Sequence, residues 1–412
     1  MRNSRIVIIG LMLAVISAAF SFAAGPKAYV GLFKDNAIAV LDTATNRVLG
    51  TIPIPAGPHG LAVTPNGKTV YASSDGDSKV SVIDTATDTV VKAIEVGKSP
   101  HGLAMTPDGK TLLAAVFGAG QVAFIDTASN TLVAVLPVAS PHNIAISPDG
   151  RTAYVAVQGK GALALVILDI PRMTRKGSVA LDKTPRALNF SPDGSKLYFT
   201  LAGSDSVQVL DTASNTVARE VPVGASPHHP IFTADGSGAL VVSQGPGSLY
   251  AIDPAGDTVR ANVKVGTLPH WIALAADART AYVTNEGSND VSVVNLATLS
   301  VITTVAVGNA PRKIVIQPAG SASSMSRAGT VRTKISGFAF EDTIRVSTGQ
   351  TVIWENTDAV PHTVTSDSKV WSSGDIAPGK TFSMTFNAAG TYPYHCDIHP
   401  SMQAEVIVDA SM

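Results

Sequence analysis

The sequence predicts an all-β protein in which a seven-bladed β-propeller is followed by a small β-sandwich. A unit of about 40 residues occurs seven times, and each unit holds four short β-rich runs, which is the pattern of a propeller blade. The turns between the runs, such as "TPDGK" and "DTATD", carry Asp, Asn or Gly where the backbone must bend. The repeat then stops, and the alternating strands of residues 333–410 predict the sandwich.

The seven units also predict how the propeller closes. Aligned on the strand that follows each turn, the units begin at residues 28, 70, 112, 153, 197, 239 and 281. The first unit opens on what would be the second strand of a blade, and residues 312–318 supply a first strand after the last unit. The two ends of the region 28–319 can therefore share one blade, which closes the ring without a free sheet edge.

A proline precedes the innermost strand of every blade, and the residue after it is histidine in five of the seven units. Because blades are arranged radially, these side chains should meet at one mouth of the central channel. The expected ring consists of His59, His101, His142, Arg186, His228, His270 and Arg312, with His229 beside it. Converging neutral imidazoles are good ligands for copper or zinc, and the arginines could hold an anion or a small polar ligand. Duplication of one ancestral blade could also have copied the histidine without creating a site.

The N-terminus predicts export. Two arginines precede the apolar run 6–20, and small residues follow it, so residues 1–23 read as a secretory signal peptide. The run is short for a membrane span and no stop-transfer pattern follows, so we expect a periplasmic or otherwise exported protein with no stable span after cleavage. The net charge of −1 and the lack of a Lys/Arg block make nucleic acid a poor candidate partner.

Residues 320–332 are rich in Gly, Ser and Ala and read as a linker. Beyond them lies the single cysteine of the chain, which cannot form an internal disulfide. Cys396, His399 and Met402 have a C-x₂-H-x₂-M spacing, and His362 lies 34 residues upstream of the cysteine. Two imidazoles, one thiolate and a weak axial thioether are the ligands that a blue-copper site requires.

The residues also resemble known families. The run "AYVTNEGSNDVSVVNLATLSVITTVAVGNAPR" (281–312) is similar to the YVTN family of propellers. The runs "VIWENTDAVPH" and "GTYPYHC" resemble the cupredoxins, and the ligand loop is similar to that of the amicyanins. This resemblance implies one type 1 copper bound by His362, Cys396, His399 and Met402, with His399 near the surface as the route for electrons. Thr363 stands where amicyanins have an asparagine that supports the site, which leaves the surroundings of the copper open.

Other residues of interest have simpler interpretations. His395 should point to the opposite face of its strand from Cys396, and Trp354 should belong to the core, whereas Trp371 is ambiguous. The recurrent aspartates read as turn residues, so a lactonase-like hydrolase lacks a convincing acid–base pair. These aspartates are Asp42, Asp84, Asp126 and Asp211.

Two functions remain. The first is an exported electron carrier that exchanges electrons with a dehydrogenase, a cytochrome or another carrier, with the propeller as docking platform. Amicyanins work beside a dehydrogenase whose large subunit is a propeller. The second is a redox enzyme with a metal at the ring that is fed by the copper domain, since the order of domains is similar to that of nitrous oxide reductases. The single cysteine and the two arginines in the ring exclude a direct transfer of that function.

Overall fold

The computed structural model describes residues 26–159, 161–318, 330–340, 343–348, 350–368, 371–386, 388 and 390–409. The predicted signal peptide 1–23 lies outside these residues, as do residues 320–329 of the predicted linker. The described part of the chain contains strands and turns but no helix, and therefore no helix that could cross a membrane.

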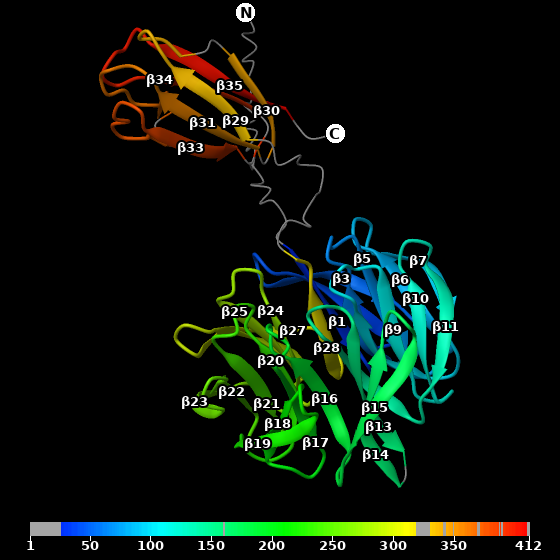
Figure 1. The fold of residues 1–412 in the computed structure, drawn as a ribbon. Helices are drawn as coiled ribbons and strands as arrows, with labels where there is room; N and C mark the ends of the chain where they lie inside the picture. The colour runs from blue at the N-terminus through cyan, green and yellow to red at the C-terminus, as the bar shows by residue number, and fades with distance from the viewer. Residues whose placement is uncertain are drawn as a thin grey trace, which may run out of the picture.

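Seven four-stranded antiparallel sheets form the predicted propeller. The innermost strands are β4 (Pro58–Val63), β8 (Pro100–Met105), β12 (Pro141–Ile146), β16 (Pro185–Phe190), β20 (Pro227–Phe232), β24 (Pro269–Leu274) and β28 (Pro311–Ile316). The second strands are β1 (Lys27–Leu32), β5 (Thr69–Ser74), β9 (Thr111–Val116), β13 (Thr152–Gly159), β17 (Lys196–Leu201), β21 (Ala239–Ser243) and β25 (Thr280–Asn285). Figure 1 shows inner strands such as β16 and β28 in the middle of this domain.

The two remaining strands of each blade lie farther from the axis. The third strands are β2 (Ala37–Asp42), β6 (Lys79–Asp84), β10 (Gln121–Asp126), β14 (Ala162–Asp169), β18 (Ser206–Asp211), β22 (Ser248–Asp253) and β26 (Asp290–Asn295). The outer strands are β3 (Arg47–Pro53), β7 (Thr89–Glu95), β11 (Thr131–Pro137), β15 (Thr174–Ala180), β19 (Thr216–Pro222), β23 (Thr258–Lys264) and β27 (Ser300–Ala306). The second and third strands are mostly buried, whereas the outer strands expose most of their residues.

The first and last strands of the propeller share one blade, as the repeat predicts. Strand β28 pairs antiparallel with β1 in a sheet of order β28-β1-β2-β3. The innermost strands also contact one another around the axis, and β28 contacts β4, so the circle is closed. These inner strands pack closely. At Gly60 there is no room for a side chain, since a Cβ would lie 2.1 Å from the backbone oxygen of His101 in the next blade.

Neighbouring blades are joined by tyrosines on the second strands, whose hydroxyl groups donate to turn residues of the adjacent blade. The fully buried Tyr198 donates to Asp257 at 2.5 Å, and this carboxylate also accepts from Lys196 at 2.9 Å. Tyr282 donates to the neutral Asn46 side chain at 2.8 Å. These contacts fix the relative position of successive blades.

The C-terminal residues form a two-sheet sandwich, as predicted. One sheet has the order β29 (Thr330–Ile335), β31 (Gln350–Asn356) and β33 (Thr381–Phe386). The other has the order β30 (Thr343–Ser347), β35 (Gln403–Asp409), β34 (Gly390–His395) and β32 (Thr365–Ser366). Strand β29 starts at Thr330, inside the segment 320–332 that the sequence predicts as linker.

The aromatic core of the sandwich is built around Trp354, which is fully buried as expected. Its indole N–H donates to the hydroxyl group of Tyr394 at 3.1 Å. Trp371 is only partly buried and packs at the edge of this core, with 6.3 Å between its ring centre and that of Trp354.

Candidate metal centre

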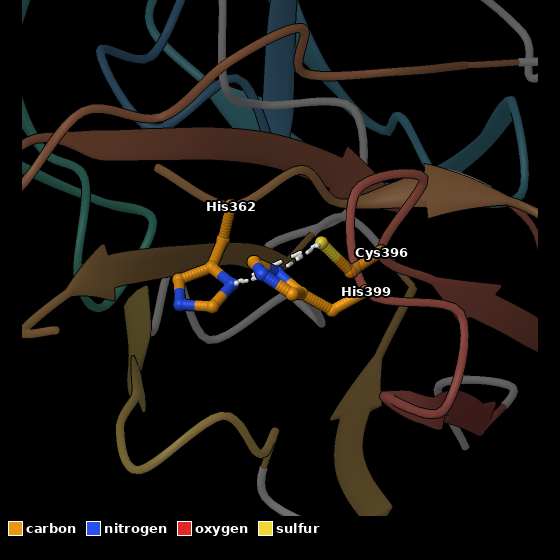
Figure 2. A group of neighbouring side chains, drawn as sticks. All are labelled: His362, Cys396 and His399. Carbon is orange, nitrogen blue, oxygen red and sulfur yellow. Dashed lines mark hydrogen bonds between the residues drawn. The ribbon is translucent and has the colours of Figure 1, made fainter. Parts of the chain in front are cut away.

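Three of the four predicted copper ligands converge at one end of the sandwich. His362 lies in the loop before β32, Cys396 follows β34 directly, and His399 lies in the turn between β34 and β35. The Sγ atom of Cys396 is 3.9 Å from Nδ1 of His362 and 3.7 Å from Nδ1 of His399, and the two nitrogen atoms are 3.1 Å apart. Figure 2 shows these donor atoms facing one another.

Met402, the fourth predicted ligand, lies in the same turn. Its backbone N–H donates to the carbonyl group of His399 at 2.9 Å, and its own carbonyl group accepts from the N–H of Cys396 at 3.1 Å. The side chain is only 3% exposed and belongs to the same apolar cluster as Cys396. The short C-x₂-H-x₂-M spacing therefore places the cysteine, the histidine and the methionine at one closed turn.

Asp358 orients the first histidine, a role that the sequence analysis missed. Its Oδ2 atom accepts from Nε2–H of His362 at 2.9 Å. The carboxylate also accepts backbone N–H groups of Gly337 at 2.6 Å and Phe338 at 2.9 Å, and these bonds hold the pKa of Asp358 below its usual range. With the proton on Nε2, the lone pair of His362 Nδ1 faces the sulfur. The available signal was an aspartate four residues before the histidine, in "TDAVPH".

Thr363 connects the two segments that carry the donors. Its backbone N–H donates to Sγ of Cys396 at 3.2 Å, and its hydroxyl oxygen accepts the backbone N–H of Asp397 at 2.7 Å. The hydrogen bond fixes the sulfur relative to the loop that carries His362. The residue that departs from the amicyanin pattern thus still supports the site.

The donor atoms lie just below the surface. His399 is half-buried, and the ring of Phe338 stands edge-on to it at 5.0 Å between ring centres. Phe338 is 53% exposed and Ile398 is 42% exposed, and these two apolar side chains form a rim beside His399. His395 does not join the donors, because its two ring nitrogens contact carboxylates of Asp367 and Asp397.

The expected ring at the propeller axis is present. All seven predicted side chains line one cavity of about 350 Å³. The centre of the His101 ring lies 3.4 Å from that of His59 and 3.9 Å from that of His142. His228 and His270 form a second close pair at 3.9 Å.

His229 does not line this cavity. Neighbouring residues of a strand point to opposite sides, so the residue after His228 turns away from the ring. His229 stacks on Trp271 at 3.7 Å and accepts the backbone N–H of Ile272 at 3.3 Å. It lines a separate cavity of about 440 Å³, built by the later residues of the inner strands, which also contains Lys313.

The imidazoles of the ring are neutral near pH 7. Burial lowers the pKa of His142 to about 4 and that of His228 to about 3. Burial also lowers the pKa values of His59, His101 and His270 well below the usual range. Both arginines have hydrogen-bond partners: Arg312 pairs with Glu286 at 3.0 Å, and Arg186 donates to the hydroxyl group of Ser226 at 3.0 Å.

A second row of side chains beside the ring was missed in the sequence. It consists of one residue at the equivalent position near the end of the second strand of each blade, and its members are Phe33, Asp75, Phe117, Gln158, Ala202, Gln244 and Glu286. Gln158 lies on β13, and the other six directly follow their strands. These positions recur with the same spacing as the proline–histidine pairs, and this spacing was the available signal. Four of them line the ring cavity, and a fifth, Asp75, lies close to His59 and His101.

The recurrent aspartates cap turns, as predicted. The side chain of each accepts backbone N–H groups two or three residues further on. They are Asp42, Asp84, Asp126 and Asp211.

Comparisons with known proteins agree with both domains. The YNCE-like beta-propeller family matches residues 17–105 and 100–354, and the family of copper-binding proteins of the plastocyanin/azurin type matches residues 328–409. Amicyanin-alpha of Methylorubrum extorquens is 36% identical over 88 residues, which cover 20% of this chain and 74% of that protein. Amicyanin of Paracoccus denitrificans is 37% identical over 71 residues, which cover 16% of this chain and 54% of that protein.

Solved structures resemble the propeller in fold. Hydrazine synthase of Kuenenia stuttgartiensis superposes with a TM-score of 0.61 at 21% identity, over 69% of this chain and 99% of that one. The periplasmic gluconolactonase PpgL of Pseudomonas aeruginosa superposes with a TM-score of 0.59 at 20% identity, over 71% of this chain and 99% of that one. At such identities the likeness concerns the fold alone. The chain belongs to the YNCE-like beta-propeller family and ends in a copper-binding domain of the plastocyanin/azurin family.

Proposed function

We propose that the protein is an exported one-electron carrier that holds a single type 1 copper at His362, Cys396, His399 and Met402. The observation that carries this proposal is the convergence of one sulfur and two Nδ1 atoms, with 3.1 to 3.9 Å between them. A thiolate and two imidazoles with a nearby thioether fit copper in both of its oxidation states. When bound, copper supplies a one-electron Cu(II)/Cu(I) couple.

The chain keeps the donors in place while the charge of the site changes. Asp358 holds the ring of His362, and Thr363 ties the loop of His362 to the segment after Cys396. Because these contacts do not depend on the metal, the donor positions need little rearrangement when an electron enters or leaves.

The rim around His399 is the surface at which we expect a redox partner to dock. Phe338 and Ile398 form an exposed apolar patch beside a half-buried ligand, so a partner that covers them comes close to the donor set. A dehydrogenase, a cytochrome or another electron carrier fits this role, and the propeller serves as a docking platform. The amicyanin relatives and the predicted signal peptide support export to the periplasm.

A second function, a redox enzyme with a metal at the propeller ring, is favoured by one observation. Five neutral histidines line a single cavity. In that case the C-terminal copper would supply or remove electrons during chemistry at the ring. Metal content after loss of the C-terminal donors distinguishes the two functions.

The purified mature protein, loaded with Cu(II), tests the main proposal. We expect one copper per chain and a strong visible absorption from the bond between sulfur and copper, which ascorbate should bleach. Cys396→Ser should abolish the absorption, whereas His395→Ala, a change at the neighbouring residue, should retain it. A colourless copper-loaded protein, or an absorption that survives Cys396→Ser, would refute the proposal. The mass of the N-terminal peptide, measured on protein from a periplasmic fraction, tests cleavage after residue 23.

A further inference from the structure

We propose that His59, His101 and Asp75 form a second metal site at the propeller ring, suited to a divalent ion of borderline softness such as Zn(II) or Cu(II). The inference goes beyond the electron-carrier function, because it concerns the other domain and an additional ion. It also names two of the five ring histidines as the ligands and adds the carboxylate of Asp75, which is not one of the ring residues.

The geometry brings the three side chains together from two adjacent blades. His59 lies on β4, Asp75 follows β5 of the same blade, and His101 lies on β8 of the next blade. One donor atom of each lies within 4.8 Å of the others. Two imidazole nitrogens and a carboxylate oxygen are a donor set that zinc and copper both accept.

Asp75 is the strongest indication of a cation site. Its Oδ1 atom is fully buried and finds no hydrogen-bond partner among the described residues. Burial raises the pKa of Asp75 to about 6, although the positive charge of Arg312 acts in the opposite direction. A buried carboxylate oxygen without a partner is costly, and a bound cation removes that cost.

Arg312 does not supply this cation. Its guanidinium pairs with Glu286 at 3.0 Å and lies over the ring of Phe33, at 3.5 Å from the ring centre. Because Glu286 offsets the charge of Arg312, a metal ion beside His59 and Asp75 does not face an uncompensated positive charge there.

The histidines present lone pairs. Burial keeps both rings neutral at pH 7, so a metal need not displace a proton from them. Nδ1–H of His101 donates to the backbone oxygen of His142 at 3.1 Å. This bond orients the ring and leaves Nε2 of His101 free to bind a metal, as the backbone contacts of metal-binding histidines generally do.

Three protein donors leave a position for a further ligand. Zinc sites with three protein ligands and an open position bind water or a small substrate there. His59 and His101 border the cavity of about 350 Å³, and Arg186 lines that cavity as well. A small anion bound to the metal would therefore have a guanidinium within the same cavity.

The test uses the mature, tag-free chain with His362→Ala and Cys396→Ser, so that the C-terminal donors no longer bind metal. Equilibrium dialysis against Zn(II) should find one ion per chain, and Co(II) should bind at the same site with visible d–d bands. In this background Asp75→Asn should weaken binding at least about tenfold. The double change His59→Ala and His101→Ala should abolish binding.

Two matched controls remove the same chemical groups elsewhere in the propeller. His228→Ala removes a ring histidine and Asp84→Asn removes a turn carboxylate of the blade that carries Asp75, and neither should alter the affinity by as much as Asp75→Asn. Circular dichroism confirms that each variant is folded. If the histidine variants unfold, Asp75→Asn still decides the test, because asparagine has the same shape as aspartate.

Several results would overturn the inference. These are no bound Zn(II) or Co(II) in the background chain, an affinity unchanged by Asp75→Asn, or equal losses in the two controls. Binding of phosphate or sulfate without metal would instead assign the cavity to an anion. The visible absorption of the copper-loaded parent chain is measured separately. A chain without the ring metal site can therefore still be an electron carrier, and a colourless copper-loaded chain can still bind a metal at the ring.

Discussion

Replacing Asp358 by asparagine should weaken copper binding, although Asp358 is not one of the expected ligands. The carboxylate accepts three N–H groups: Gly337 contacts Oδ1, and Phe338 and His362 contact Oδ2. An asparagine side chain has one acceptor oxygen and one NH₂ group, so it cannot accept on both sides. If its oxygen stays with Phe338 and His362, its NH₂ group faces the N–H of Gly337.

The opposite orientation of the amide has a direct consequence for the ligand. The NH₂ group would then face Nε2 of His362, and the ring would have to place its proton on Nδ1, the atom that faces the sulfur of Cys396. A metal would have to displace that proton. Loss of the partner that orients a ligand histidine generally lowers metal affinity about 10- to 100-fold, and we expect a loss in this range.

Competition between the protein and a chelator of known affinity measures this effect for Cu(II) through the visible absorption. The matched control is Asp367→Asn, because Asp367 contacts His395 rather than a ligand. The reasoning fails if Asp358→Asn binds Cu(II) as tightly as the parent chain, or if the control loses as much affinity.

Three further changes probe the propeller, with unfolding in urea followed by circular dichroism. Tyr198→Phe removes a hydrogen bond to a buried carboxylate of the next blade and should cost about 1.5–3 kcal/mol, whereas Tyr282→Phe, with a neutral partner, should cost about 0.5–1.5 kcal/mol; equal losses would contradict this. Gly60→Ala places a Cβ 2.1 Å from a backbone oxygen and should cost at least about 1–3 kcal/mol, while Gly50→Ala, with open space around it, should cost little. Burial lowers the pKa of Lys313 to about 7 in the folded chain, whereas an unfolded lysine has its ordinary pKa of about 10. Between these pH values the unfolded chain therefore binds one more proton than the folded chain, so the free energy of unfolding should rise with pH there. Lys313→Met should remove this slope, and a parent chain without the slope would refute the assignment.

The features that the sequence predicts well are those repeated along it or packed into a short loop. The proline that begins each inner strand recurs in every blade, so the ring of histidines and arginines follows from symmetry alone. The spacing from Cys396 to Met402 is so short that a single turn must bring the ligands together. In both cases local spacing determines the spatial arrangement.

The features that were missed depend on which side chain stands at one particular position and on what that side chain contacts. Asp75 occupies its position in one blade only, and its importance comes from His59 and from His101 of the next blade. Asp358 acts through a loop whose path is set by Gly337 and by the sandwich core. His229 was expected beside the ring because it is adjacent in sequence, but the pleat of the strand turns it away.

The direction of β28 has a consequence for how the two domains can work. The strand begins at Pro311 and Arg312, at the ring, and ends at Ile316, which lines the second cavity. The chain therefore leaves the propeller at the end of the channel away from the histidines. Residues 317 and 318, the last described residues before the C-terminal domain, follow the end of β28 that lies away from the histidine ring. Substitutions at the copper ligands should therefore leave the ring cavity intact, and substitutions at the ring should leave the copper ligands intact.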